Sequence, residues 1–181
     1  MISPADRQFL LKIARNTLSE YLTEGTMPEL QTESPTLLEA RAVFVTLRDR
    51  LSGDLRGCRG ETQARQPLIE AVARMTIASA LDDPRFPPVC VEEMPQLHIE
   101  INALTPLAPI LPEEITIGRH GLMIVKGYYA GLLLPEVAVR YGWDVETFLQ
   151  AVCHKAGLPE NAWTAKTAKL FGFETEVWGE A

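Results

Sequence analysis

Residues 97–103 alternate strictly between apolar and polar side chains, and this pattern constrains the fold more than any other in the chain. An extended backbone points successive side chains to opposite faces, so such a segment predicts a strand with one buried and one polar face. One face presented to solvent is typical of antiparallel sheets. The apolar positions are Leu97, Ile99, Ile101 and Ala103, and the polar positions are His98, Glu100 and Asn102.

Helices and further strands surround this segment. Ser3 and Pro4 suit the start of a helix, and Gly25 suits its end. Residues 41–49 alternate as a second strand, and the turn LSGD returns the chain as a short strand over LRGC, 55–58. Two more helices are expected, one starting at Pro67 and ending before Asp83-Pro84, and one capped by Asp144 and ending at Gly157.

The remaining segments also read as strands and connections. Residues 115–135 indicate three short strands joined at Gly118–Gly121 and Gly127–Gly131, and residues 168–179 close the chain with alternation. Helices and strands are mixed without regular strand-helix alternation. We therefore expect an α+β fold, a mostly antiparallel sheet with flanking helices, in one domain spanning 1–181.

The charge of the chain limits its partners. Among 181 residues the formal net charge is −7, which argues against a polynucleotide or an anionic membrane as the general partner but leaves room for a small basic site. No stretch reaches the roughly 20 apolar residues of a membrane span. Three widely spaced cysteines with no CxxC pair fit a reducing compartment, so we expect a cytoplasmic protein.

The stretch GDLRGCRGE, residues 53–61, concentrates glycine, arginine and one cysteine. A guanidinium beside Cys58 would stabilise the thiolate, the form that acts as a nucleophile. Alternatively, the two arginines and free backbone amides would form a nest for an anion, with Arg56, Gly57, Arg59 and Gly60 as ligands. In a purely structural interpretation the glycines shape a tight bend and Cys58 fills a small space.

Two further segments carry polar side chains suited to a site. Glu100 and Asn102 share the polar face of their strand, where a carboxylate can act as an acid or base. Arg119 and His120 lie between glycines in GRHG, and histidine titrates near neutrality. No ligand spacing supports a metal, and no cofactor is expected. We interpret Cys90 and Cys153 as core residues.

The motif LRGCRG resembles the signature hexapeptide of the AMMECR domain family. The resemblance continues through DDPRFPP, LHIEINALTPL, IGRHGLMI, GLLLPEVAVRYGW and FLQAVCHKAGLP, and so covers nearly the whole chain. It implies a fold with a larger and a smaller lobe. Prokaryotic members are protein A of the AmmeMemoRadiSam system, which implies a Memo-like protein and a radical SAM protein as partners. The family usually has isoleucine where this chain has Arg59.

Together these observations predict an intracellular protein of uncharacterised biochemical activity with an active-site or ligand cleft at LRGCRG. Two alternatives stay open: a module that binds an anionic small molecule, nucleotide or RNA through Arg56 and Arg59, and a scaffold for partner proteins. The sequence leaves open whether the protein is an enzyme. The catalytic candidates are Cys58, Glu100 and His120, and the ligand-binding candidates are Arg56, Gly57, Arg59, Gly60, Asn102 and Arg119.

Overall fold

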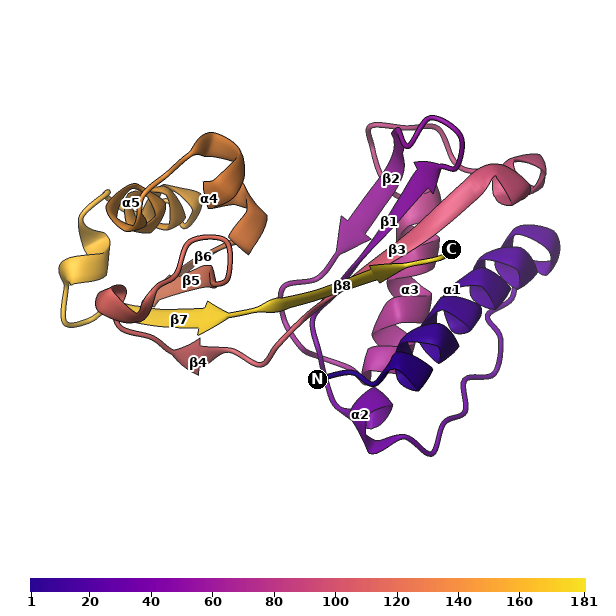
Figure 1. The fold of residues 1–181 in the computed structure, drawn as a ribbon, viewed down its shortest axis with the longest axis horizontal. Coiled ribbons are helices and arrows are strands. Elements are labelled where there is room, and N and C mark those ends of the chain that lie inside the picture. Colours follow the sequence, from indigo (N-terminus) through magenta and orange to yellow (C-terminus); the bar gives the residue numbers. More distant parts are fainter. The chain divides into compact units, whose positions relative to one another are not determined.

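The alternating segment forms strand β3 (Leu97–Leu104), which lies inside a four-stranded sheet in the computed structural model of residues 1–181 (Figure 1). The strand order is β2-β1-β3-β8, and β1 is antiparallel to both of its neighbours. The other strands are β1 (Val43–Asp49), β2 (Leu55–Gly60) and β8 (Thr175–Gly179).

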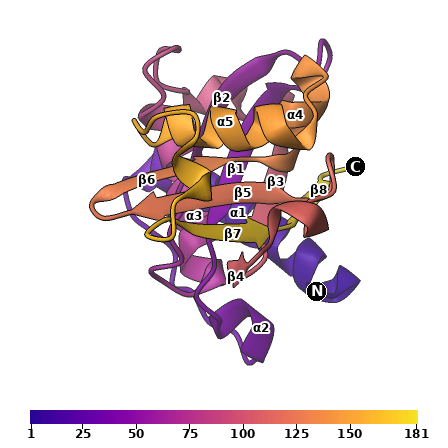
Figure 2. The same cartoon turned by 90° about the vertical axis from the view of Figure 1, so that its left-hand side faces the viewer.

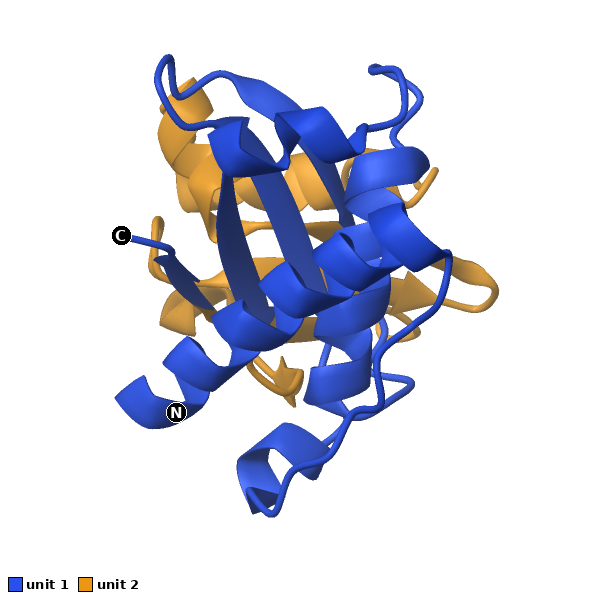
Figure 3. Ribbon diagram, turned by 90° about the vertical axis from the view of Figure 1, so that its right-hand side faces the viewer, with its two compact units in different colours: residues 1–104, 176–181 blue, residues 105–175 orange.

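Two helices, α1 (Pro4–Glu24) and α3 (Leu68–Leu81), cover one face of this sheet (Figure 3). As predicted, the Ser3 hydroxyl accepts a hydrogen bond from the Asp6 amide, and Gly25 ends α1 with a φ of 73°. A short helix, α2 (Pro35–Leu38), and a 3-10 helix, η1 (Val91–Gln96), lie in the connections.

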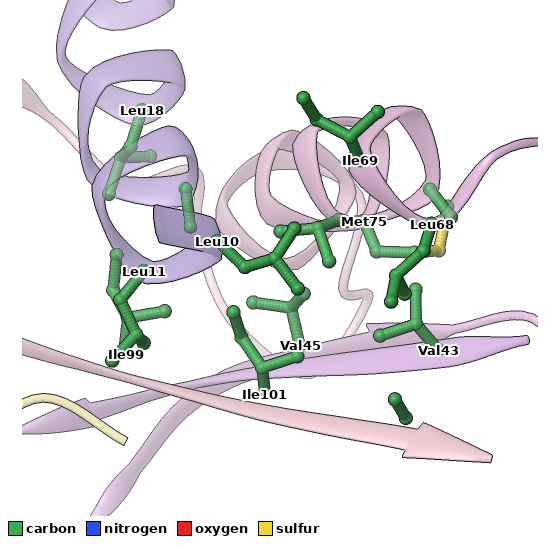
Figure 4. Packing of buried hydrophobic residues seen from close by; sticks show 14 of the residues in the cluster. Leu10, Leu11, Leu18, Val43, Val45, Leu68, Ile69, Met75, Ile99 and Ile101 are labelled. Atoms are coloured by element: carbon green, nitrogen blue, oxygen red, sulfur yellow. The ribbon is translucent and has the colours of Figure 1, made fainter. Parts of the chain in front are cut away.

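The core between the sheet and the helices is built from the apolar side of each strand. The inward residues of β1 and β3 point toward α1 and α3 (Figure 4). Their polar neighbours, at the alternate positions, therefore lie on the face of the sheet away from these helices. Labelled members of this core are Leu10, Leu11, Leu18, Val43, Val45, Leu68, Ile69, Met75, Ile99 and Ile101.

A second sheet has the order β4-β7-β5-β6, and its strands lie side by side in Figure 2. Its strands are β4 (Ala108–Pro109), β5 (Gly121–Lys126), β6 (Tyr129–Leu133) and β7 (Lys169–Phe173). Its helices are α4 (Pro135–Tyr141) and α5 (Val145–Lys155), with 3-10 helices η2 (Pro112–Glu114) and η3 (Ala162–Thr164). Their common core includes Leu122, Ile124, Phe148, Leu149 and Val152.

The two sheets belong to two compact units. Unit 1 comprises residues 1–104 and 176–181, and unit 2 comprises residues 105–175 (Figure 3). The predicted α+β class, with antiparallel sheets, flanking helices and a larger and a smaller lobe, is confirmed. None of the helices combines the length and the hydropathy needed to cross a bilayer.

Three sequence interpretations were wrong. Residues 115–117 form no strand, so residues 115–135 supply two strands rather than three. The closing alternation is not one strand, because β7 and β8 belong to different sheets. Cys90 is exposed rather than buried, and it has a polar partner, because its thiol and its amide both hydrogen-bond the Glu93 carboxylate.

Candidate functional site

Cys58 lies in a row of three side chains across the sheet of unit 1. Thr46 on β1 is paired with Cys58 on β2 and with Glu100 on β3. Directly paired residues project to the same face, and this face is the one away from α1 and α3. We call these three residues the thiol row. Within it, the Thr46 hydroxyl donates a hydrogen bond to Cys58 Sγ over 3.4 Å.

Glu100, at the other end of the thiol row, has a basic neighbour. Its Oε2 lies 3.8 Å from Arg48 Nε, and both side chains are about one-third exposed. An ion pair at this distance and exposure is weak. The carboxylate of Glu100 can therefore accept a hydrogen bond from a bound molecule.

The next row of the same face contains Phe44 between Gly60 and Asn102. A Cβ on Gly60 would lie 2.1 Å from Phe44 Cδ1, so the glycine makes room for the ring. Asn102 Oδ1 is buried and has no hydrogen-bond partner. A buried polar atom without a partner costs about 1–3 kcal/mol, and ligand binding by Asn102 stays a prediction because this oxygen is closed to solvent.

Gly57 explains how β2 packs on α3. A Cβ on Gly57 would lie 2.1 Å from the backbone oxygen of Ser79, so only glycine allows this approach. The Ser79 hydroxyl accepts from the Arg59 amide at 2.9 Å and lies 2.7 Å from the Val45 carbonyl. Through these two hydrogen bonds, helix α3 is joined to β1, which carries Thr46, and to β2, which carries Cys58.

Asp83, just beyond α3, fixes the backbone of Cys58. Its Oδ2 accepts from the Cys58 amide at 2.8 Å and from Arg85 Nη2 at 2.6 Å, and the residue is only 4% exposed. The hydrogen bonds from Arg85 are the main reason that the pKa of Asp83 lies well below its usual range. The carboxylate stays ionised, and it braces the glycine-rich strand at the Cys58 amide.

Arg85 is the residue that sequence reasoning undervalued. Its Nε and Nη2 bind Asp83, while Nη1 has no partner and the side chain is 55% exposed. Its guanidinium also lies 5.5 Å from the centre of the Phe86 ring. The pKa of Arg85 is raised, mainly by Asp83 and additionally by the negative charge of a Cys58 thiolate. Because Asp83 Oδ2 accepts from both the Cys58 amide and Arg85 Nη2, a cation is held close to the residue that carries the thiol.

Arg56, in contrast, is fully engaged. Its Nε and Nη2 bind the Glu93 carboxylate at 2.7 and 3.0 Å, and its Nη1 donates to the Pro87 carbonyl. This ion pair lowers the pKa of Glu93 to about 2. Arg59 is exposed, but its backbone amide, like that of Cys58, is already bonded within the protein. The anion nest at Arg56–Gly60 stays a prediction, and no vacant amide at Cys58 or Arg59 adds to it.

The two remaining candidates belong to unit 2. Arg119 Nε donates to Glu174 Oε1 at 2.9 Å, and His120 Nδ1 accepts from the Thr116 amide at 3.0 Å. The structure thus places Cys58, Glu100 and Asn102 on one face in unit 1, and His120 in the other unit. No group of three or more histidine, cysteine, aspartate or glutamate side chains is arranged to hold a metal ion.

The fold and the thiol row define an α+β protein with a half-buried cysteine on the face of an antiparallel sheet that lies away from α1 and α3. Over residues 11–178 the chain matches the AMMECR1 family model, and it belongs to this family. Protein PH0010 of Pyrococcus horikoshii is 44% identical over 183 residues, covering 96% of this chain and 89% of the relative. Protein MJ0810 of Methanocaldococcus jannaschii is 41% identical over 179 residues, covering 95% and 89%.

A solved structure also resembles this fold. The crystal structure of the uncharacterized protein PH0010 from Pyrococcus horikoshii has a TM-score of 0.78 and 43% sequence identity, and the match covers 95% of this chain and 90% of that one.

Proposed function

We propose that this member of the AMMECR1 family is an intracellular protein that engages a substrate or partner group at LRGCRG, with the Cys58 thiol as the reacting group. The observation that carries the proposal is the thiol row, in which Thr46 donates to Cys58 Sγ. A hydroxyl that donates to sulfur favours the thiolate. Asn102, in the next row of the same face, is the ligand-binding candidate of this proposal, with its amide group as the contact.

The roles of the neighbouring groups follow from their positions. The thiolate of Cys58 attacks an electrophilic carbon, an S–C bond forms, and the leaving group departs with its electron pair. The thiol gives up its proton to solvent before the attack, and Glu100, which Thr46 separates from Cys58 in the same row, is the candidate acid or base for the bound molecule. Arg85 stabilises negative charge near the sulfur, because its Nη1 is free and its guanidinium is oriented by Asp83.

The proposal includes the partners that the resemblance implies, a Memo-like protein and a radical SAM protein. In this proposal, the Cys58 thiol reacts with a chemical group that one of the partner proteins supplies or consumes. Mixing the three purified proteins should give a complex on size-exclusion chromatography, and Cys58→Ser should leave that complex intact. Three separate peaks would contradict the partnership.

The first test of the reacting group is the alkylation rate of each cysteine with iodoacetamide, read by peptide mass spectrometry. The pKa of the Cys90 thiol is raised by hydrogen bonds to Glu92 and Glu93, and burial raises the pKa of Cys153. Both should react slowly, and Cys58 should react fastest. A Cys58 as slow as Cys153 until the protein unfolds would contradict the proposal.

A matched pair of variants isolates the contribution of the thiol row. Thr46→Val removes the hydroxyl that donates to Cys58 Sγ and should slow its alkylation. Thr62→Val changes an exposed threonine without a hydrogen bond to the site and should leave the rate unchanged. Equal rates in both variants would mean that the hydroxyl does not activate the thiol.

Two alternative functions, an anion-binding module and a scaffold for partner proteins, make different predictions. An anion-binding module predicts that Arg56→Ala abolishes ligand-induced thermal shifts while Cys58→Ser does not. A scaffold predicts a stable complex with the partners and no chemistry at Cys58. Because Arg56 is already bound to Glu93, the geometry favours a reaction at Cys58 over anion binding at Arg56.

A further inference from the structure

Unit 2 contains a hollow of its own, about 350 Å³ in volume, that the proposed function does not use. It lies where β4, β7 and the turn before β5 meet. This volume is at the lower end of the range for small-molecule sites. We call it the unit 2 hollow. Its polar lining is Thr105, Glu114, Arg119, His120 and Glu174, and its apolar lining includes Pro106, Pro109 and Ile110.

Two adjacent residues provide unpartnered donors to this hollow. Arg119 uses Nε and Nη2 toward Glu174 Oε1, each at 2.9 Å, and its Nη1 has no partner. His120 Nδ1 accepts from the Thr116 amide at 3.0 Å, so the neutral ring carries its proton on Nε2. His120 Nε2 has no partner either, which leaves it as a free donor. Two such donors, on adjacent residues that line the same hollow, suit a carboxylate.

The same hollow also contains acceptors. Glu114 uses Oε2 for the Leu111 amide at 2.7 Å and keeps Oε1 free. Glu174 uses Oε1 for Arg119 and keeps Oε2 free. With a neutral histidine, one guanidinium faces two carboxylates, so the hollow is negative overall and a simple anion would be repelled. A ligand with one negative and one positive group matches both the donors and the acceptors of the hollow.

The Arg119–Glu174 ion pair does not block the site. The side chains of Arg119 and Glu174 are 63% and 45% exposed, and exposed pairs of this kind contribute little to stability. A ligand carboxylate therefore competes for the guanidinium at small cost. The glutamate that is released then faces the ammonium group of the same ligand.

The apolar wall defines the rest of the ligand. Pro109 and Ile110 follow each other along the edge of the sheet. A Cβ on Gly172 would lie 2.7 Å from Ile110 Cδ1, so the glycine makes room for this isoleucine. We propose that the unit 2 hollow binds a small zwitterion of the α-amino acid type: its carboxylate on Arg119 and His120, its ammonium on Glu174 and Glu114, and its apolar body on Ile110.

The test uses the full chain and stands apart from the chemistry at Cys58. The isotope-labelled protein is titrated with L-leucine, and amide shifts are followed by NMR. Saturable shifts are expected at Gly121 and Gly172. N-acetyl-L-leucine, without the ammonium, and L-leucinamide, without the carboxylate, should each bind at least about tenfold more weakly. No saturable shift with L-leucine up to tens of millimolar would overturn the proposal, as would equal binding of N-acetyl-L-leucine.

Variants assign the two charges. Arg119→Gln should weaken L-leucine about tenfold, while Arg140→Gln, an exposed arginine on α4, should change nothing. Glu174→Gln should weaken L-leucine but not N-acetyl-L-leucine. These residues are exposed or partly exposed, so the variants should keep dispersed native spectra. An Arg119→Gln protein that binds L-leucine normally would overturn the proposed carboxylate contact.

Discussion

The backbone amide of Cys58 donates a hydrogen bond of 2.8 Å to the carboxylate of Asp83, which lies 25 residues further along the chain. Asp83 in turn binds the Nε and Nη2 of Arg85. One nearly buried carboxylate therefore fixes both the thiol-bearing strand and the nearby guanidinium. The position of the thiol depends on the segment after α3 as much as on its own motif.

We expect Asp83→Asn to destabilise the protein by about 2 kcal/mol, because it weakens charge-assisted hydrogen bonds at a nearly buried position. Urea unfolding measures the loss. The matched control is Asp82→Asn, an exposed neighbour, which should stay within about 0.5 kcal/mol of the parent. Equal effects of the two changes would show that Asp83 does not anchor β2.

Acid should lower the stability of unit 1, because Glu93 becomes protonated. Its pKa in the folded protein is lowered to about 2 by Arg56, whereas an unfolded glutamate titrates near about 4.3. The contribution to stability is therefore present above about pH 4 and is lost as the pH falls toward about 2. Unfolding free energies measured by urea titration from pH 6 downward, at about one-unit steps, should show this decline.

Glu93→Gln should flatten that decline, because the amide cannot titrate. Glu70→Gln, an exposed residue of α3 with no hydrogen bond, should retain the parental pH dependence. If Glu93→Gln showed the same slope as the parent, other carboxylates would have to account for the acid sensitivity.

The glycines of LRGCRG should differ in their tolerance of alanine. Gly57→Ala puts a methyl 2.1 Å from the Ser79 backbone oxygen, and Gly60→Ala puts one 2.1 Å from the Phe44 ring. A ring can turn aside, whereas the backbone of a packed helix cannot. We expect a loss of about 3 kcal/mol for Gly57→Ala and a smaller one for Gly60→Ala, measured by thermal unfolding.

Gly53→Ala serves as the comparison for these two. Gly53 has a φ of 76° and open space around its Cα, so alanine costs only backbone strain, about 1–2 kcal/mol. A Gly57→Ala protein as stable as Gly53→Ala would mean that β2 moves away from α3 without penalty.

Local pattern predicted the elements whose signals lie within a few residues. Helix α1, with Ser3 and Gly25 at its ends, and strand β3 are found where the sequence placed them. The break between β7 and β8 has no such signal. Alternation continues through Glu174 with no proline or glycine next to it, and the change of sheet depends on which partner strand each half meets.

The site was predictable only in part, because its key contacts join distant residues. Alternation gave the shared face of Glu100 and Asn102. Alternation along one strand does not predict which strands pair. The pairing of both β2 and β3 with β1 is what puts Cys58 in the same row as Glu100. Arg56 looked like a free cation because its partner Glu93 lies 37 residues away.

Arg85, rather than Arg56 or Arg59, should determine how the charge of a reagent affects its reaction with Cys58. Iodoacetate and iodoacetamide react with the same sulfur and differ in one negative charge. The ratio of the iodoacetate rate to the iodoacetamide rate therefore measures the local electrostatic potential, because changes in the reactivity of the thiol itself cancel. A guanidinium near the thiol raises this ratio. Arg85→Gln should lower it about threefold at low salt, with the rates read at Cys58 by peptide mass spectrometry.

Arg59→Gln is the matched control, because it removes one positive charge from the residue next to Cys58. Arg59 is paired with Val45 while Cys58 is paired with Thr46, so the two side chains leave β2 on opposite faces. The ratio should change less than in Arg85→Gln, and added salt should reduce both effects through screening. If Arg59→Gln lowered the ratio more than Arg85→Gln, the cation that acts on Cys58 would be Arg59.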